Sequence, residues 1–408
     1  MSIITKIKII ADFWYTLFMK RFLQKCRISA AGILLLFFIA LSASAQESLI
    51  KIGVSLGLTG KYSEMSDMQM KGFRLWESDV NKRGGLLGKK VRVIIYDDKS
   101  DPRTAKSLYE HLILNDKVDL VFGPYSSEIT EAALPITEKH GYPLLASGAS
   151  ADRLWQKGYK YIFGVYSPAS KYSVGFLELL VRNDLQNIAI VYADDAFSVD
   201  IANGTKKWAE RFGLKVVLFE GFKKGTENLD FIALKAKASK AQALIVCGHF
   251  NESVSMRRSL KKINWQPKAY FASVGPAMPA FQTNLKSDAN YVFSSSQWEY
   301  IGGSIIPGCK EFYHAYIHAY NETPSYHTAT AYASGQILEA AIKNTGSIER
   351  EKLRAVLLSL DTITVIGRHG VDKKGKQIKH FNLIIQWQNE EKKIVWPEGL
   401  KTANPIFR

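Results

Sequence analysis

The pattern that decides the fold lies in residues 118–150, VDLVFGPYSSEITEAALPITEKHGYPLLASGAS. Apolar runs at 118–123 and 142–146 predict two short strands, because near-continuous apolar runs are typical of parallel strands that are covered on both faces. Residues 127–140 predict a helix that follows two serines and ends before Gly141, where a left-handed residue is favoured. A strand-helix-strand unit of this kind indicates a parallel sheet.

The same alternation extends in both directions along the chain and then repeats. The first array adds strands at 51–58, 91–98 and 161–166, with helices near 68–83 and 102–115. The second array has strands at 187–193, 215–219, 243–248, 269–273 and 291–295, with helices near 170–183, 198–212, 228–240 and 251–263. Helices near 307–321, 326–344 and 348–360 follow, and a strand pair at 370–375 and 381–388 closes the chain. The sequence therefore predicts an α/β protein with two doubly wound parallel sheets.

Composition excludes several other classes of protein. The chain has 408 residues, of which 47% are hydrophobic and 23% charged, and this is ordinary globular composition rather than that of a disordered or collagen-like chain. Three cysteines are too few for a disulfide scaffold. Cys247 lies in an apolar run and is expected to be a buried small side chain, although a pairing with Cys309 stays open in an oxidising compartment. Their spacing fits no metal motif.

The N-terminus resembles an export signal. Basic residues precede an apolar run at 30–41, and Ala43-Ser44-Ala45 provides the small residues that a signal peptidase requires. We therefore expect residues 1–45 to be a signal peptide, the mature chain to begin at Gln46, and the protein to be periplasmic or secreted. The alternative is an uncleaved anchor, although the run is short for a bilayer.

Charge and motif searches give no sign of nucleic-acid binding or catalysis. Removal of residues 1–45 lowers the formal net charge from +16 to +11, and the remaining lysines are scattered rather than clustered, so no nucleic-acid partner is expected. The pattern Gly53-x-Ser55-x-Gly57 matches a nucleophile elbow, but it falls inside a predicted strand instead of at a strand-to-helix turn. An exported hydrolase would need a nucleophile and a base in contact, and no motif supports that pair. The prediction is no catalytic site, no metal and no cofactor.

Two loops of small, hydroxyl-bearing residues follow neighbouring strands of the first array. Ser126 and Ser127 come after the strand at 118–123, and Gly148, Ala149 and Ser150 come after the strand at 142–146. Open α/β sheets bind ligands in the crevice at the carboxyl ends of their strands. Hydroxyl groups and the free backbone N–H groups of a helix start favour an anion. Helix capping alone would explain one serine, but both loops together indicate a ligand site.

A family resemblance rests on the order and spacing of several short motifs over roughly residues 50–390. These motifs are Leu58-Thr59-Gly60, Gly84-Gly85-Leu86-Leu87-Gly88, Asp97-Asp98, Asp101-Pro102, Gly123, Ser126-Ser127, Pro143, Ser147-Gly148-Ala149-Ser150, Asp194-Asp195-Ala196-Phe197, Asp230-Phe231 and Pro324-Ser325-Tyr326. The chain resembles the periplasmic substrate-binding proteins of ABC transporters, specifically the leucine/isoleucine/valine-binding type.

The resemblance implies a type I periplasmic binding fold, in which two lobes joined by a hinge of three crossovers close on a ligand. We expect the N-terminal lobe to comprise 46–168 and 298–368, the C-terminal lobe 169–297 and 369–395, and a C-terminal tail 396–408. The implied function is that of a monomeric binding protein, not an enzyme, that hands a small polar ligand to a membrane permease. The ligand would be an amino acid, an amide or a small carboxylate. A ligand sensor of the same fold, acting on a signalling partner, is the alternative.

The resemblance also carries individual residues into the expected pocket. The residues that align approximately with pocket-lining positions are Met65, Tyr125, His249, Trp298 and Tyr326. Phe197-Ser198 stands where the family has a tyrosine-glycine pair, so one hydroxyl is missing. Val274 falls where the amino-acid binders have an acid that pairs with the ligand amine, and a buried ammonium without a counter-charge is costly. An α-amino acid ligand would then require Asp195 or Glu299 as a substitute.

Overall fold

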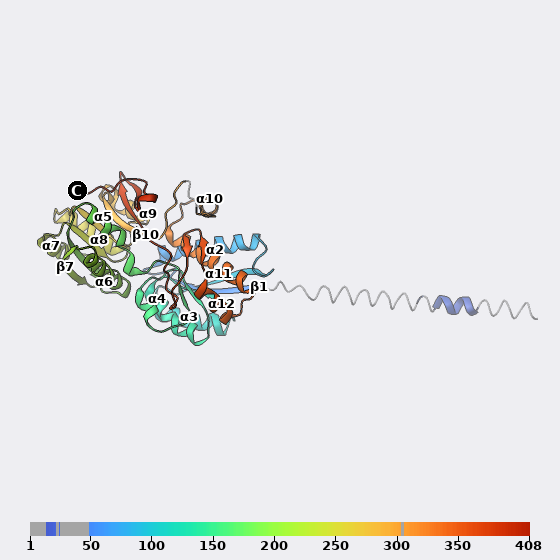
Figure 1. Ribbon diagram of the computed structural model, residues 1–408. Helices are drawn as coiled ribbons and strands as arrows, with labels where there is room; N and C mark the ends of the chain where they lie inside the picture. The colour runs from blue at the N-terminus through green and yellow to red at the C-terminus, as the bar shows by residue number, and fades with distance from the viewer. Residues whose placement is uncertain (1–13, 22–23, 25–48, 303–305) are drawn as a thin grey trace, which may run out of the picture. The chain divides into compact units, whose positions relative to one another are not determined.

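The computed structural model of the protein describes residues 14–21, 24, 49–302 and 306–408 (Figure 1). The apolar run at 30–41 and the cleavage site predicted after Ala45 lie outside these residues. Ile50–Arg408 form one compact unit that contains both sheets. Within the described part of the chain, no helix is both long enough and apolar enough to cross a bilayer.

The first sheet has five strands in the order β2-β1-β3-β4-β5. Its strands are β1 (Leu49–Leu56), β2 (Lys90–Asp97), β3 (Leu120–Phe122), β4 (Leu144–Ala146) and β5 (Ile162–Gly164). Its first helices are α2 (Ser63–Lys82), α3 (Pro102–Leu114) and α4 (Ser127–Lys139). Strands β1, β3, β4 and β5 pair in parallel, with Ile52 opposite Leu120 and Val121 opposite Leu144.

Three helices from late in the chain return to this first lobe: α10 (Cys309–Tyr320), α11 (Tyr326–Thr345) and α12 (Arg350–Ser359) (Figure 1). Helix α11 packs against α2. A Cβ atom on Gly335 would lie 2.1 Å from the Trp76 ring, so only glycine lets α11 approach this fully buried indole. Phe73 stacks on Phe122 with 4.7 Å between ring centroids and completes the core at this point.

The second sheet has seven strands in the order β14-β13-β10-β9-β8-β6-β7. Its strands are β6 (Asn187–Ala193), β7 (Lys215–Phe222), β8 (Ala243–Cys247), β9 (Ala269–Ala272), β10 (Val292–Ser296), β13 (Leu383–Gln388) and β14 (Glu391–Trp396). The helices of this lobe are α5 (Val174–Arg182), α6 (Ala196–Arg211), α7 (Asp230–Ala238), α8 (Phe250–Lys262) and α9 (Pro279–Leu285). Phe176 packs on Phe271 and Phe293 at its centre. The predicted fold class, two doubly wound α/β lobes, is confirmed.

The end of the chain differs from the prediction. Strand β13 pairs antiparallel with both β14 and β10. The segment 370–375, which was predicted as a strand, instead contains Val371 in an isolated bridge to Gln377. A short hairpin of β11 (Thr362–Thr364) and β12 (Gly367–His369) precedes it. Strand β14 was missed because its sequence begins Glu-Lys-Lys, the charged composition of an exposed edge strand.

The predicted C-terminal tail is packed against the second sheet. The backbone N–H of Ile406 donates to Gln386 Oε1 over 2.9 Å, and that of Arg408 to the Lys268 carbonyl over 3.0 Å. Cys247 and Cys309 are buried free thiols, so the disulfide left open by the sequence is not formed. The lobe boundaries given above stay a prediction.

Candidate ligand site between the lobes

The two sheets share a strand order, and this order determines where a ligand crevice is expected at the carboxyl ends of their strands. In each sheet the first strand of the array lies between the second and the third, as β2-β1-β3 and β7-β6-β8. In such sheets the strand order reverses beside the first strand, so that the loops after the two neighbouring strands lead to opposite faces of the sheet and leave a crevice between them. The loops after β3, β6 and β8 carry Ser126, Asp195 and His249. The topology therefore explains why serine, aspartate and histidine from distant parts of the sequence meet.

A buried cavity of about 20 Å³ lies at this meeting point. Its walls are formed by Tyr125, Ser126, Ser127, Gly148, Ser150, Tyr166, Tyr172, Phe197, His249, Val274, Tyr326 and His327. A cavity of this size has room for about one water molecule, so a solute of several heavy atoms enters only if the lobes or the side chains move apart.

Most predicted site residues line this cavity, and four do not. Met65 packs with Tyr62 and Tyr125 and lines a separate groove instead of this cavity. Ala149 is buried in the hydrophobic core. Asp195 reaches the cavity only through His249. Trp298 packs on Phe312 and lines a different cavity at the crossover segments.

Four helices begin at the cavity. Helix α4 starts after Ser126, α6 after Asp195, α8 after His249 and α11 after Ser325. The N-terminus of each helix carries partial positive charge and unpaired N–H groups. Asp195 offsets this charge at α6 because its carboxylate accepts from the N–H of Phe197. At α8, Glu252 accepts from the His249 N–H, and at α11 the Ser325 hydroxyl accepts from the Thr328 N–H. The start of α4, which has no side-chain cap, therefore best favours a negatively charged group in the cavity.

Two polar atoms of the first lobe are buried in the cavity wall without a hydrogen-bond partner. They are Ser126 Oγ and His327 Nε2. Ser126 precedes α4, but its hydroxyl makes no capping hydrogen bond. His327 Nδ1 lies 3.0 Å from the Tyr166 hydroxyl, and burial lowers the pKa of this ring to about 3, so the ring is neutral. Buried polar groups without partners are rare and costly, and both atoms are free to hydrogen-bond a group that enters the cavity.

Ser127, Gly148 and Ser150 hold the two loops together. Ser127 Oγ accepts from the N–H groups of Ser150 and Ala151, each over 3.2 Å. Ser150 Oγ lies 3.0 Å from the Tyr172 hydroxyl. A Cβ on Gly148 would lie 2.8 Å from the Pro124 carbonyl, so this position requires glycine. Ser150 was predicted to bind the ligand, and its hydroxyl also has a structural role because it is bonded to Tyr172.

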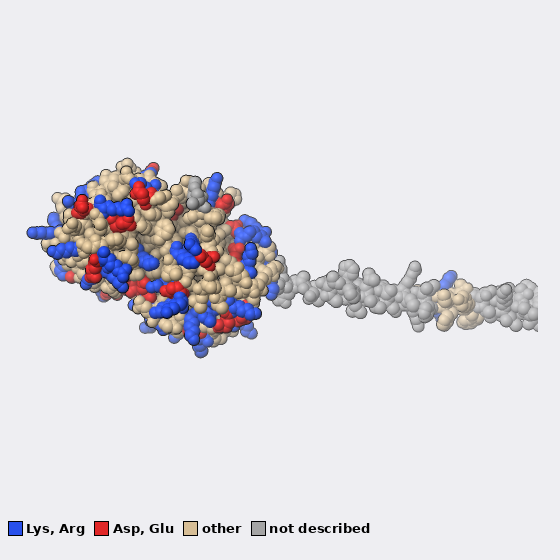
Figure 2. Space-filling model, viewed as in Figure 1, with Lys and Arg blue, Asp and Glu red and all other residues tan. Residues whose placement is uncertain are grey.

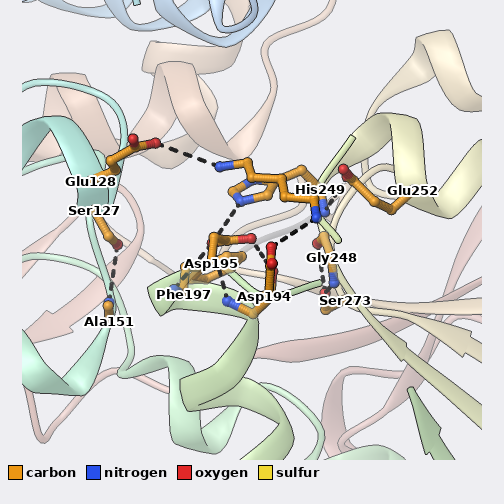
Figure 3. Close-up of polar contacts among 12 residues, drawn as sticks. Ser127, Glu128, Ala151, Asp194, Asp195, Phe197, Gly248, His249, Glu252 and Ser273 are labelled. Atoms are coloured by element: carbon orange, nitrogen blue, oxygen red, sulfur yellow. Dashed lines mark hydrogen bonds and ion pairs between the residues drawn. The ribbon is translucent and has the colours of Figure 1, made fainter. Parts of the chain in front are cut away.

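Asp195 and His249 are hydrogen-bonded to each other in the second lobe (Figure 3). Asp195 Oδ1 lies 3.2 Å from His249 Nε2, and Asp195 Oδ2 accepts from the Ser198 hydroxyl. Burial opposes ionisation of Asp195, but His249, Lys224 and Ser198 together hold its pKa well below the ordinary value. The carboxylate thus already has its partners.

No free acid faces the cavity among the described residues that line it. Val274, which the resemblance places where the amino-acid binders have an acid, lines the cavity. Glu299, the other proposed substitute, pairs with Lys392 over 2.8 Å and lines the separate cavity at the crossovers. The second lobe therefore presents Phe197, Val274 and the His249 ring, and it lacks a free carboxylate for a ligand amine.

Tyr166, Tyr172 and His327 line the cavity but were missed from the sequence. Tyr166 and Tyr172 lie in the first crossover between the lobes, at the end of the strand predicted at 161–166 and near the start of the helix predicted at 170–183, and neither pattern indicated that these side chains face a ligand. His327 directly follows Tyr326, which was predicted, and its place beside the start of a helix was the one available signal.

The serine of the elbow-like motif has a structural role. Ser55 Oγ donates to Asp98 Oδ2 over 2.7 Å inside the first lobe, and both side chains are fully buried. Its partner is thus a buried carboxyl and not an imidazole base. Among the described residues, no group of three or more His, Cys, Asp or Glu side chains is arranged to hold a metal ion.

A cavity enclosed by two doubly wound lobes, with the starts of several helices in its wall, defines a bilobal ligand-binding protein. Residues 49–392 match the family model described as periplasmic binding protein, and the chain belongs to this family. The predicted resemblance is thereby confirmed.

The relatives of this chain include binding proteins with different named ligands. The Leu/Ile/Val-binding protein homolog 8 of Brucella abortus (strain 2308) is 26% identical over 380 residues, which cover 88% of this chain and 93% of the relative. LivJ of Streptococcus pneumoniae, solved with isoleucine, has a TM-score of 0.76 at 24% identity, covering 86% of this chain and all of its own. A solute-binding protein of R. palustris, solved with benzoate, has a TM-score of 0.74 at 16% identity, covering 88% and 99%. These two structural likenesses show the shared fold.

Proposed function

We propose that this chain is the exported substrate-binding protein of an ABC importer, and that it captures a small carboxylate-bearing solute between its lobes for delivery to a membrane permease. The observation that carries the proposal is the cavity itself. Both lobes contribute to its wall, four helices begin there, and Ser126 Oγ and His327 Nε2 are buried there without partners. Such an arrangement binds and releases a solute without any covalent step.

The chemistry of the wall favours a carboxylate with an apolar or aromatic body over a free amino acid. The start of α4 and the Ser126 hydroxyl suit the anionic end. Tyr172, Phe197 and Val274 suit an apolar body, and Phe197 meets Tyr172 edge to face with 5.5 Å between centroids. An ammonium group would have no free carboxylate to pair with, which is costly in a buried site.

Figure 2 shows Lys and Arg dispersed over the visible face, with acidic side chains between them. No large basic patch of the kind that tracks a nucleic-acid backbone is seen on this face. We propose a periplasmic or secreted location for the mature chain and a monomeric state in solution. Intact-mass measurement of the exported protein checks the first point, because the mass should correspond to a chain that begins at Gln46.

A thermal-shift screen with matched solutes tests the ligand class. The pairs differ only in the amine: isoleucine with 3-methylpentanoate, and phenylalanine with 3-phenylpropanoate, with benzoate as a further probe. A solute at 100 times its dissociation constant should add about 2.7 kcal/mol to the free energy of unfolding. The acids without an amine should give the larger shift. A larger shift with the amino acids would refute the ligand class, and no shift with any carboxylate would refute the carboxylate site.

A further inference from the structure

Three polar residues join the two lobes beside the cavity. Lys224, from the loop after β7 in the second lobe, donates from Nζ to the Tyr62 hydroxyl over 2.9 Å. The same Nζ lies 3.6 Å from Glu128 Oε2, and Tyr62 donates to that oxygen over 3.2 Å. Tyr62 and Glu128 belong to the first lobe. Tyr62 directly precedes α2, and Glu128 lies in the first turn of α4. A single lysine therefore bridges two groups across the cleft.

The second lobe holds Lys224 in place before it meets these partners. The Lys224 backbone N–H donates to Asp194 Oδ1 over 2.8 Å, and the Gly225 N–H donates to Glu252 Oε1 over 3.0 Å. Gly225 has a φ of +80°, which favours glycine at this turn. Acids after β6 and on α8 thus fix the backbone on both sides of the lysine. The backbone at Lys224 is therefore already ordered, and contact with the first lobe has to order only the rotamers of its side chain.

The charges of this cluster support one another. The Lys224 side chain is 23% exposed, and although burial disfavours its charge, Tyr62, Asp195 and Glu128 raise its pKa above the ordinary value. Burial likewise opposes ionisation of Glu128, but Lys224 and Lys61 hold the pKa of its carboxyl below the usual range. A charged lysine and a charged glutamate make the contact charge-assisted, which strengthens it relative to a neutral hydrogen bond.

The cluster lies between the cavity and the outside. The Tyr62 ring meets Tyr125 edge to face at 5.4 Å and lies 6.1 Å from the His249 ring, and both of these residues line the cavity. On its other side, Tyr62 lines an outer groove of about 390 Å³ together with Lys224, Met65 and His249. His249 thus belongs to both walls, and Tyr62 separates the two spaces.

We propose that Lys224, Tyr62 and Glu128 form an interlobe clasp that stabilises the closed arrangement of the cleft even before a solute is bound. The clasp must part for a solute to reach a cavity of about 20 Å³, so it sets the balance between open and closed forms. This inference rests on the proposed function in one respect, which is that the lobes open to admit a solute. The clasp itself consists of protein groups alone.

The test measures lobe separation without any solute. Spin labels at Ser107→Cys on α3 and Ala238→Cys on α7, both exposed, report the distance between the lobes. The full chain also carries Cys26→Ser, and Cys247 and Cys309 are buried and escape labelling. Lys224→Met, which keeps the length of the stem, and Glu128→Gln should each lower the ratio of closed to open molecules, by about five- to tenfold for Lys224→Met.

Lys61→Met is the matched control. Lys61 also pairs with Glu128, over 3.2 Å, but both residues belong to the first lobe, so their contact does not depend on closure. This variant should leave the distance distribution unchanged. High salt should open the parent protein and have little effect on Lys224→Met. The proposal is overturned if Lys224→Met and Glu128→Gln keep the parent distribution, or if Lys61→Met opens the lobes equally.

The outcome is separate from that of the solute screen. If the distances shift as expected and no solute binds, the clasp stands and the proposed function fails. If a solute binds and the distances do not respond to the substitutions, the function stands and the clasp fails. Should Lys224→Met fold poorly, Glu128→Gln and Tyr62→Phe remove the partners on the first lobe and give the same readout.

Discussion

Ser126→Ala should weaken solute binding without destabilising the free protein. The Ser126 side chain is 4% exposed, its hydroxyl has no partner, and it makes no capping hydrogen bond to α4. A buried hydroxyl without a partner costs about 1–3 kcal/mol, so its removal should leave the free energy of unfolding unchanged or raise it. This differs from most serines before a helix, whose replacement by alanine costs about 1 kcal/mol.

The effect on binding should have the opposite sign. A hydrogen bond to a charged group is worth roughly 1.5–3 kcal/mol, which corresponds to a loss of affinity of about 10- to 150-fold. Urea denaturation gives the first quantity, and calorimetric titration with the solute that shifts most in the thermal screen gives the second.

Ser150→Ala provides the contrast. Its hydroxyl is bonded to Tyr172 within the protein, so its loss should lower the free energy of unfolding by about 1 kcal/mol. If Ser126→Ala destabilises the free protein by more than Ser150→Ala, the Ser126 hydroxyl has a structural partner. If Ser126→Ala binds like the parent, the proposed contact with the anionic end is wrong.

Three further predictions concern the first lobe and the buried histidines. Gly148→Ala should lower the free energy of unfolding by about 1–3 kcal/mol in urea denaturation, because the new methyl would lie 2.8 Å from both the Pro124 carbonyl and Gln69 Nε2; unchanged stability would show that the loop can yield. Ser55→Ala should destabilise the first lobe, since Asp98 loses its donor, yet change solute affinity by less than about threefold in calorimetry; a large loss of affinity would place Ser55 in the site. Burial lowers the pKa of His327 to about 3 and those of His369 and His380 to about 4, so the unfolded chain binds more protons than the folded one from near pH 6.5 downward. Above about pH 6.5 the neutral rings do not lower the free energy of unfolding. As pH falls below this value, each ring lowers the free energy of unfolding by up to about 1.4 kcal/mol per pH unit. Asp98, whose pKa burial raises to about 6, acts in the opposite sense between about pH 4 and 6. Urea midpoints at pH 7 and 5 should therefore fall in the parent and fall less in His327→Gln, and equal losses in both proteins would contradict the role of His327.

The sequence predicted the elements that carry strong local signals. Strand β6 was predicted at its observed bounds, and the other buried parallel strands within a few residues, because continuous apolar runs are unambiguous when both faces of a sheet are covered. Strand β14 was missed because an edge strand lacks such a run. The loops at 124–127 and 147–150 were predicted as ligand-facing because their position after neighbouring strands fixes the edge on which they lie.

The chain by itself determined the two serial α/β arrays, the first-lobe loops and the absence of an acid at Val274, since these follow from local pattern and position along the strands. Only the tertiary structure decided how each polar group is used. Ser126 and Ser127 are adjacent and chemically identical, but one hydroxyl is unpartnered in the cavity and the other binds the N–H groups of Ser150 and Ala151. Asp195 is paired with His249, and Lys224 crosses to Tyr62, because folding brings together loops that are far apart in the chain. Hydrogen bonds and ion pairs depend on distance and direction in space, and a linear sequence records neither.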